Sequence, residues 1–321
     1  MRDSEAFNTR QCDGFHPPFW CRGGHTQTIL SSLFKSVTNF DAERIRINTP
    51  DEDFLDLDVK ENQDSHRVAI LFHGLEGSSR RYYVTNLANE LYRNGYTFVA
   101  VNFRSCSGDM NRKPRFYHSG ETEDLATVFK WISRNFPNHR QFAAGFSLGA
   151  SALLNFLRRH QTAHPLEAAA GISTPFDLKK GSLNLNYGFN QIYNYYFLSS
   201  LKRKIEEKRK IYPDIPEFTG NTLYKFDDQV TAPLHGFKNA DHYYKTCSSS
   251  FFMDQIKSPL LVIHSKTDPL CPFHLTPTGS LLQNPNITSC IVDRGGHVGF
   301  WCKSKNWLEK NIVMFFNQFG K

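Results

Sequence analysis

The sequence contains a serine, an aspartate and a histidine in an order that is typical of catalytic triads. Ser147 comes first, Asp268 follows far downstream, and His297 comes last. A serine hydroxyl is a poor nucleophile until a positioned base removes its proton and an acid orients that base. Serine, acid and then histidine is one of the chain orders in which such triads occur. These residues therefore predict acyl transfer through a serine.

The surroundings of Ser147 strengthen this prediction. Ser147 lies in Gly145-Phe146-Ser147-Leu148-Gly149, between an apolar run and a helix-like segment. A strand, a tight turn and a helix form the context in which Gly-x-Ser-x-Gly makes a nucleophile elbow. Larger side chains two residues on either side would collide with the neighbouring strand and helix. The turn would hold the hydroxyl beside a helix N-terminus, which favours negative charge.

The two partners each stand in the loop where a triad needs them. Asp268 is the only carboxylate in residues 265–270, directly after an apolar run, although an aspartate before Pro269 also suits a simple turn. His297 lies between glycines in residues 293–300, ahead of the last helical segment. Asp293 is a rival acid, but it is too close to His297 along the chain and follows the wrong strand.

An oxyanion hole needs two backbone N–H donors. Leu148, the residue after the nucleophile, supplies one. The other should come from residues 73–79, and we assign it to Leu75, with Gly74 as the second choice. His73 is expected to pin this loop by hydrogen bonding rather than to act as a base.

No cofactor or metal site is expected. His160 and His164 are one helical turn apart but lack a third ligand. His235 and His242 are expected to be structural. No Cys-x-x-Cys pair occurs, and free thiols in a reducing compartment are expected for the seven cysteines, at positions 12, 21, 106, 247, 271, 290 and 302.

The remaining sequence predicts the elements that position these residues. Residues 43–48 and 54–60 are expected to form an antiparallel edge hairpin with one solvated face. Continuous apolar runs then alternate with amphipathic helices, which indicates a parallel sheet covered by helices on both faces. Buried strands are expected at 68–72, 96–103, 141–144, 168–172, 259–264 and 287–292, and helices at 82–93, after a Ser119 cap, after Ser147 and at 307–316.

The alternation stops between about residues 175 and 254, which predicts an inserted helical cap. The expected organisation is a core over residues 1–174, the cap over 175–255 and the rest of the core over 256–321. Residues 14–30 contain prolines and glycines and are expected to be irregular.

Composition and charge argue against a disordered chain, a nucleic-acid-binding protein and a membrane-spanning protein. A hydrophobic share of 40% with 21% charged residues is typical of a globular chain. The net charge of +7 comes without a nucleic-acid motif. The basic residues at 202–210 are expected to form a solvated helix face, with peripheral contact to an anionic membrane as the alternative. A polar N-terminus and the lack of a long apolar run favour a cytoplasmic protein.

Several segments resemble the YheT-like family of α/β-hydrolases, which includes plant embryogenesis-associated proteins and animal membrane-anchored phospholipase relatives. They are residues 25–28 (HTQT), 73–79 (HGLEGSS), 102–108 (NFRSCSG), 117–124 (YHSGETED), 226–228 (FDD), 241–244 (DHYY) and 295–300 (GGHVGF). The resemblance implies a carboxylic ester hydrolase and carries over to Ser147, Asp268 and His297. Ala150 departs from the family, whose members often have a second glycine there.

The hypothesis from the sequence is a cofactor-free serine esterase of the α/β-hydrolase fold, acting on short- to medium-chain or lipid-like esters. The 28 Phe residues favour an acyl-binding cleft in the cap. Two alternatives remain open: an acyltransferase that uses the same acyl-enzyme, and a ligand-binding protein that keeps the fold without the chemistry.

Overall fold

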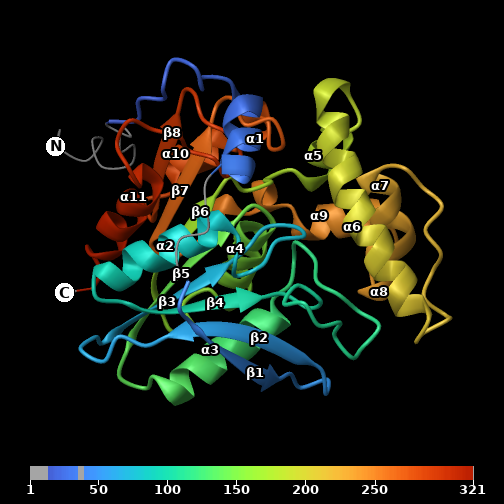
Figure 1. Ribbon diagram of the computed structural model, residues 1–321, viewed down its shortest axis with the longest axis horizontal. Helices are drawn as coiled ribbons and strands as arrows, with labels where there is room; N and C mark the ends of the chain where they lie inside the picture. Colours follow the sequence, from blue (N-terminus) through green and yellow to red (C-terminus); the bar gives the residue numbers. More distant parts are fainter. Residues whose placement is uncertain (1–13, 35–39, 321) are drawn as a thin grey trace.

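One eight-stranded sheet organises the computed structural model, which describes residues 14–34 and 40–320. Its strand order is β1-β2-β4-β3-β5-β6-β7-β8 (Figure 1). The antiparallel hairpin of β1 and β2 forms one edge, and β3 to β8 are parallel. The strands are β1 Glu43–Asn48, β2 Phe54–Lys60, β3 Arg67–Phe72, β4 Thr97–Asn102, β5 Arg140–Phe146, β6 Leu166–Ile172, β7 Leu260–Ser265 and β8 Ile287–Val292.

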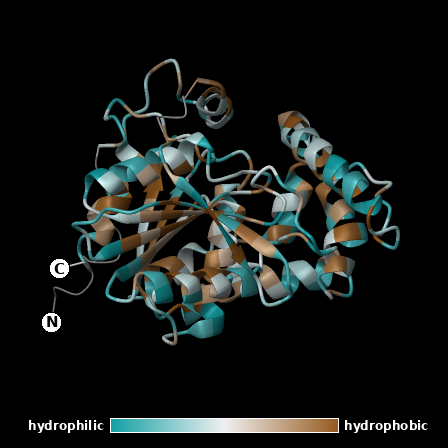
Figure 2. Ribbon diagram, turned by 60° about the horizontal axis from the view of Figure 1, so that its bottom comes forward, coloured by the Kyte–Doolittle hydropathy of each residue, from teal (hydrophilic) through white to brown (hydrophobic). Residues whose placement is uncertain are grey.

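Helices cover both faces of this sheet, which confirms the expected fold class. Alternate strand residues point to opposite faces, so Val68 and Ile70 of β3 join one apolar cluster while Ala69 and Leu71 join the other. On the first face pack α3 Glu123–Asn135, α4 Leu148–His160 and α10 Thr278–Gln283; on the second pack α2 Tyr82–Arg93 and α11 Trp307–Phe316. The apolar strands run through the middle of the molecule in Figure 2.

A helical cap occupies the chain between β6 and β7, at the right of Figure 1. Its longest helix is α6, and Leu198 and Ile205 of this helix belong to a third apolar cluster, separate from the two that flank the sheet. The elements between β6 and β7 are α5 Leu178–Asn184, η1 Gly188–Asn190, α6 Gln191–Arg209, α7 Leu223–Phe226, the π-helical turn η2 Asp227–Thr231, α8 Ala232–Leu234, α9 Ala240–Cys247, η3 Ser249–Phe251 and η4 Met253–Gln255; η5 Phe273–Leu275 follows β7. The domain boundaries given above remain a prediction.

The basic segment of α6 is only partly the solvated face that the sequence suggested, because Arg203 and Lys210 are exposed but two lysines are held by other loops. Lys204 pairs with Glu76 at 2.8 Å, and Lys208 is fully buried, donating to the carbonyl oxygens of Asn111 and Lys113. Burial lowers the pKa of Lys208 to about 8. Charge alone could not show this orientation, because the acceptors come from distant loops.

Three further expectations about local structure were wrong. The segment expected to be irregular contains helix α1, Gly24–Phe34, because its glycines and prolines all precede or begin the helix. Helix α3 begins at Glu123, and Glu121, not Ser119, accepts the N–H groups of Glu123 and Asp124. Strand β2 has no solvated face, since its buried aspartates, Asp56 and Asp58, pair with arginines of β1.

Among the described residues, no helix combines the length and apolar character that crossing a membrane requires. Residues 1–13, which include Cys12 and the polar N-terminus discussed above, lie outside the described part of the chain.

Candidate active site

Ser147 sits at a sharp turn between β5 and α4, as the pentapeptide predicts. Its φ of 53° places a non-glycine residue in the left-handed region, which requires support from the surrounding structure. A Cβ on Gly145 would come within 2.5 Å of the Gly149 carbonyl oxygen, and one on Gly149 within 2.4 Å of the His73 carbonyl oxygen. Both glycines are therefore needed for the steric reason expected from the sequence.

Asp268 and His297 lie together at the ends of neighbouring strands β7 and β8. His297 Nδ1 is 2.9 Å from Asp268 Oδ2 and 3.1 Å from Oδ1, and both side chains are buried. Asp268 Oδ1 also accepts the N–H groups of Leu270 and Cys271 at 2.9 and 3.0 Å. A carboxylate can only accept, so Nδ1 carries the proton and Nε2 is left with the lone pair of a base.

Helix α1 holds the histidine loop in place. Thr28 Oγ1 accepts the His297 N–H at 2.9 Å, and the Ser173 hydroxyl donates to the His297 carbonyl oxygen. A Cβ on Gly296 would lie 2.7 Å from the Thr28 nitrogen, so the glycine allows this close approach. The sequence reasoning missed this role of Thr28. The HTQT segment at residues 25–28 resembles the YheT-like family, but the resemblance assigned no role to Thr28.

The end of β6 connects the backbone of Ser147 to the loop that carries His297. The Ser147 N–H donates to the Ile172 carbonyl oxygen at 2.8 Å, and the next residue, Ser173, bonds to His297. Within residues 14–34 and 40–320, no hydrogen bond joins the Ser147 hydroxyl to His297. Catalytic hydrogen bonds in unliganded enzymes are often long and tighten only with substrate.

The loop after β3 lies directly against the nucleophile. A Cβ on Gly74 would be 3.2 Å from the Ser147 Cβ. The Gly74 N–H donates to the Tyr83 hydroxyl at 3.2 Å and the Glu76 N–H to the Tyr117 hydroxyl at 2.8 Å. Between these two occupied amides, the Leu75 N–H has no hydrogen-bond acceptor among the described residues. This pattern supports Leu75 over Gly74 as an oxyanion donor beside Leu148.

His73 pins this loop, which confirms the structural role expected for it. Its Nδ1 donates to the Gly74 carbonyl oxygen at 2.7 Å, and its Nε2 accepts the Phe103 N–H at 3.2 Å. Burial lowers the pKa of His73 to about 3, so the imidazole is neutral. With both ring nitrogens occupied, His73 has no free position for proton transfer.

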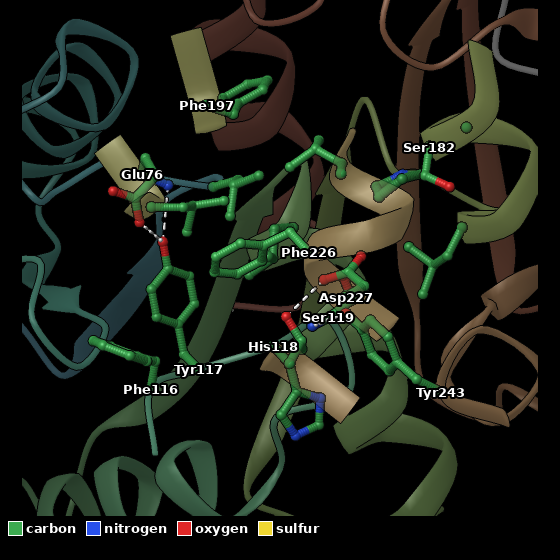
Figure 3. Close-up of a pocket in the computed structure, with 18 of the residues that line it drawn as sticks. Glu76, Phe116, Tyr117, His118, Ser119, Ser182, Phe197, Phe226, Asp227 and Tyr243 are labelled. Atoms are coloured by element: carbon green, nitrogen blue, oxygen red, sulfur yellow. Dashed lines mark hydrogen bonds between the residues drawn. The ribbon is translucent and has the colours of Figure 1, made fainter. Parts of the chain in front are cut away.

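Ser147 lines a cavity of about 140 Å³ that core and cap share. Figure 3 shows part of its wall, including Phe197 and Phe226 from the cap. Leu75 and Leu148 line the cavity from the core, and residues of α5, α6 and α7 line it from the cap. Most of the wall is apolar, with Phe116, Pro175, Leu178, Leu185, Phe197, Leu201, Leu223, Phe226, Val230 and Leu270. Such a wall suits an acyl chain bound beside the nucleophile.

One carboxyl group in the cavity wall has an unusual environment. Asp227 accepts hydrogen bonds from the Tyr244 hydroxyl at 2.6 Å and the Thr231 hydroxyl at 2.7 Å. Burial raises the pKa of Asp227 to about 6. It also raises the pKa of Tyr243 and Tyr244 well above 10, so both remain neutral.

The other candidate residues have structural partners. Asp293 is exposed and pairs with Lys266 at 2.7 Å, so it does not serve His297. His235 Nδ1 donates to the Thr231 carbonyl oxygen, and His242 Nδ1 accepts the Lys238 N–H, as expected for structural histidines. His164 Nε2 lies 2.6 Å from the Ser258 hydroxyl.

Within the described residues, one group has the spacing of a metal site: Asp268, Cys271 and His297, whose ligand atoms lie within 4.8 Å of one another. Burial raises the pKa of the Cys271 thiol well above 9, and the Asp268 carboxylate is already engaged by His297 and two amides. These contacts suit a proton-transfer pair better than a cation. Cysteines 21, 106, 247, 271 and 302 are free thiols, as expected, whereas Cys290 is disulfide-bonded and the expectation is wrong there.

Comparisons with known proteins agree with this geometry. Residues 68–304 match the family described as alpha/beta hydrolase fold. The chain is 35% identical over 301 residues to "Putative esterase YheT" of Escherichia coli (strain K12), covering 90% of this chain and 88% of that protein. It is 28% identical over 318 residues to phospholipase ABHD3 of Homo sapiens, covering 94% and 78%.

A solved structure shows the same fold at lower identity. Esterase Pf2001 of Pyrococcus furiosus superposes with a TM-score of 0.59 at 20% identity, covering 88% of this chain and 94% of the other. The family match includes the elbow, Asp268 and His297, and the alignment with the YheT protein takes in most of both chains. The protein therefore belongs to the α/β-hydrolase fold family, as a YheT-like member.

Proposed function

We propose that this protein hydrolyses carboxylic esters through an acyl-enzyme on Ser147. The observation that carries the proposal is the buried Asp268–His297 hydrogen bond at the same sheet edge as the strained elbow serine. Membership of the α/β-hydrolase family and relatives named as an esterase and a phospholipase support a hydrolase of this kind.

Each of these residues has a separate role in the proposed reaction. Ser147 Oγ attacks the ester carbonyl while His297 Nε2 takes its proton, and Asp268 stabilises the imidazolium. The N–H groups of Leu75 and Leu148 hold the oxyanion. His297 then protonates the leaving alcohol. A water molecule, deprotonated by the same imidazole, attacks the acyl-enzyme, and the imidazolium returns this proton to Ser147 Oγ as the acid leaves.

The cavity indicates the substrate class. Its wall is mainly apolar, and its volume is about 140 Å³. A short to medium acyl chain fits this space beside Ser147. We therefore propose small apolar or lipid-like esters as substrates.

Replacing Ser147 by alanine tests the proposal directly. Hydrolysis of p-nitrophenyl butyrate should fall by several orders of magnitude, because the nucleophile itself is removed. Fluorophosphonate labelling of the wild-type protein should also be lost in Ser147→Ala. Ser199→Ala, on the exposed side of α6, is the control and should retain both activities. Activity of Ser147→Ala comparable to wild type would overturn the proposal.

The same experiment separates the two alternatives. An unlabelled wild-type protein without turnover would indicate a ligand-binding protein. Labelling together with ester products formed from added alcohols, rather than free acid, would indicate an acyltransferase.

A further inference from the structure

A buried carboxylate stands directly beside the proposed oxyanion donor. Glu76 follows Leu75, and its φ of 52° puts it in the left-handed region. Its side chain is only 2% exposed, and a charge so far from water must be paired and hydrogen-bonded. The carboxylate has three partners: the hydroxyls of Tyr117 and Ser200 and the ammonium group of Lys204.

Two of these partners belong to the cap. Ser200 and Lys204 are one turn apart on α6, so they present their polar atoms from the same side of the helix. The Lys204 ammonium lies 2.8 Å from Glu76 Oε1, and the Ser200 hydroxyl donates to Oε2. Glu76 therefore ties the loop after β3 to the longest helix of the cap.

The third partner fixes the backbone of the loop. The Tyr117 hydroxyl accepts the Glu76 N–H at 2.8 Å and donates to Glu76 Oε1 at 3.0 Å, and Figure 3 shows it between these two groups. The preceding peptide group is held as well, because the Gly74 carbonyl oxygen accepts from Gly77 N–H at 3.0 Å and from His73 Nδ1. In a planar trans peptide this carbonyl direction also sets the direction of the Leu75 N–H.

We propose that Glu76 is a positioning residue that holds the Leu75 N–H in the oxyanion hole and makes its position depend on the docked cap helix α6. The inference rests on the proposed function. Oxyanion donors act only if they are fixed before the reaction, and removing one costs about 10²- to 10³-fold in kcat. Loss of the ion pair with Lys204 allows the loop to leave its left-handed conformation, and the donor is then misplaced.

Glu76→Gln tests this role, since it keeps the size of the side chain and removes its charge. We expect kcat for p-nitrophenyl butyrate to fall on the order of ten- to a hundredfold, with KM changed less than about threefold. A trifluoromethyl ketone, whose serine adduct places an oxyanion in the hole, should lose affinity by a similar factor. Lys204→Met should act alike, and the double variant should be no worse than the single ones, because the two residues act through one contact.

The matched control is Glu121→Gln, which removes another buried carboxylate, paired with Arg115 and without contact to Leu75. It should lower the melting temperature and leave kcat unchanged. Ser200→Ala is the mildest change and should lower kcat about threefold even if the charge variants do not fold. Folded Glu76→Gln with wild-type kcat and inhibitor affinity would overturn the inference, as would unchanged kcat in Ser200→Ala when Glu76→Gln does not fold. If Ser147→Ala stays active, the proposed function itself fails.

Discussion

At the scale of single residues, burial sets the charge state of the groups around the cavity. His73 stays neutral because its pKa falls to about 3, whereas Asp227 takes up protons readily because its pKa rises to about 6. In the Asp268–His297 pair, the carboxylate accepts from the imidazole and from two backbone amides. These hydrogen bonds orient the proposed catalytic pair.

Asp227→Asn should show the cost of ionising this carboxyl group. Because the pKa is raised in the folded state, folding is favoured most below pH 4, and stability is lost as pH rises through about 6. Asparagine has no charge to bury. We expect the variant to gain on the order of 2 kcal/mol in free energy of unfolding, relative to wild type, between pH 4 and pH 7. Urea unfolding across this range measures the difference, and a difference independent of pH would contradict the assignment.

At the scale of elements, each proposed catalytic residue follows a parallel strand and contacts a segment distant in sequence. Ser147 follows β5, Asp268 follows β7, and His297 follows β8. Parallel strands end at the same edge of a sheet, so these loops meet there. Helix α1 then supports the histidine loop through Thr28.

Thr28→Val tests whether α1 contributes to catalysis. Valine keeps the shape of threonine but cannot accept the His297 N–H. A lost hydrogen bond of about 1 kcal/mol at the loop should lower kcat roughly five- to tenfold, with little change in KM. Ser32→Ala, on the exposed side of the same helix, should behave as wild type. Equal kcat values for the two variants would show that α1 plays no part in positioning His297.

At the scale of the whole molecule, the cap closes an apolar space over the elbow. Core and cap share this cavity, which explains why α6 carries both apolar lining residues and the lysine that binds Glu76. Substrate length should therefore depend on cap side chains that do not touch the reacting atoms.

Leu201→Phe should shorten the acyl chain that the enzyme accepts. Leu201 lines the cavity from α6, and a larger side chain there fills space next to Phe197. Each methylene group excluded from an apolar site costs about 0.8 kcal/mol, or about fourfold in kcat/KM. The ratio of kcat/KM for octanoate to acetate p-nitrophenyl esters should fall, while the acetate value stays constant. Ile211→Phe, at an exposed position after α6, should leave the ratio unchanged.

The sequence by itself determined the sheet and the candidate catalytic residues. Apolar runs and helical periodicity gave β1, β2, β8, α2 and α11 with the bounds that the structure shows. Local patterns succeed here because strands and amphipathic helices each show their characteristic spacing of apolar residues within about a dozen residues. The triad candidates could also be predicted from the sequence, because the order of the strands indicates which loop should carry each residue.

Only the tertiary structure decided how these loops are held. The roles of Thr28, Ser173 and Glu76 depend on partners more than a hundred residues away, and no local spacing encodes such contacts. The same cause explains why the prediction for α6 was only partly right, since lysines at regular helical spacing resemble a solvated face. Lys204 and Lys208 point inward because they bind a carboxylate and backbone carbonyl groups of other loops. Only the folded chain brings those groups together.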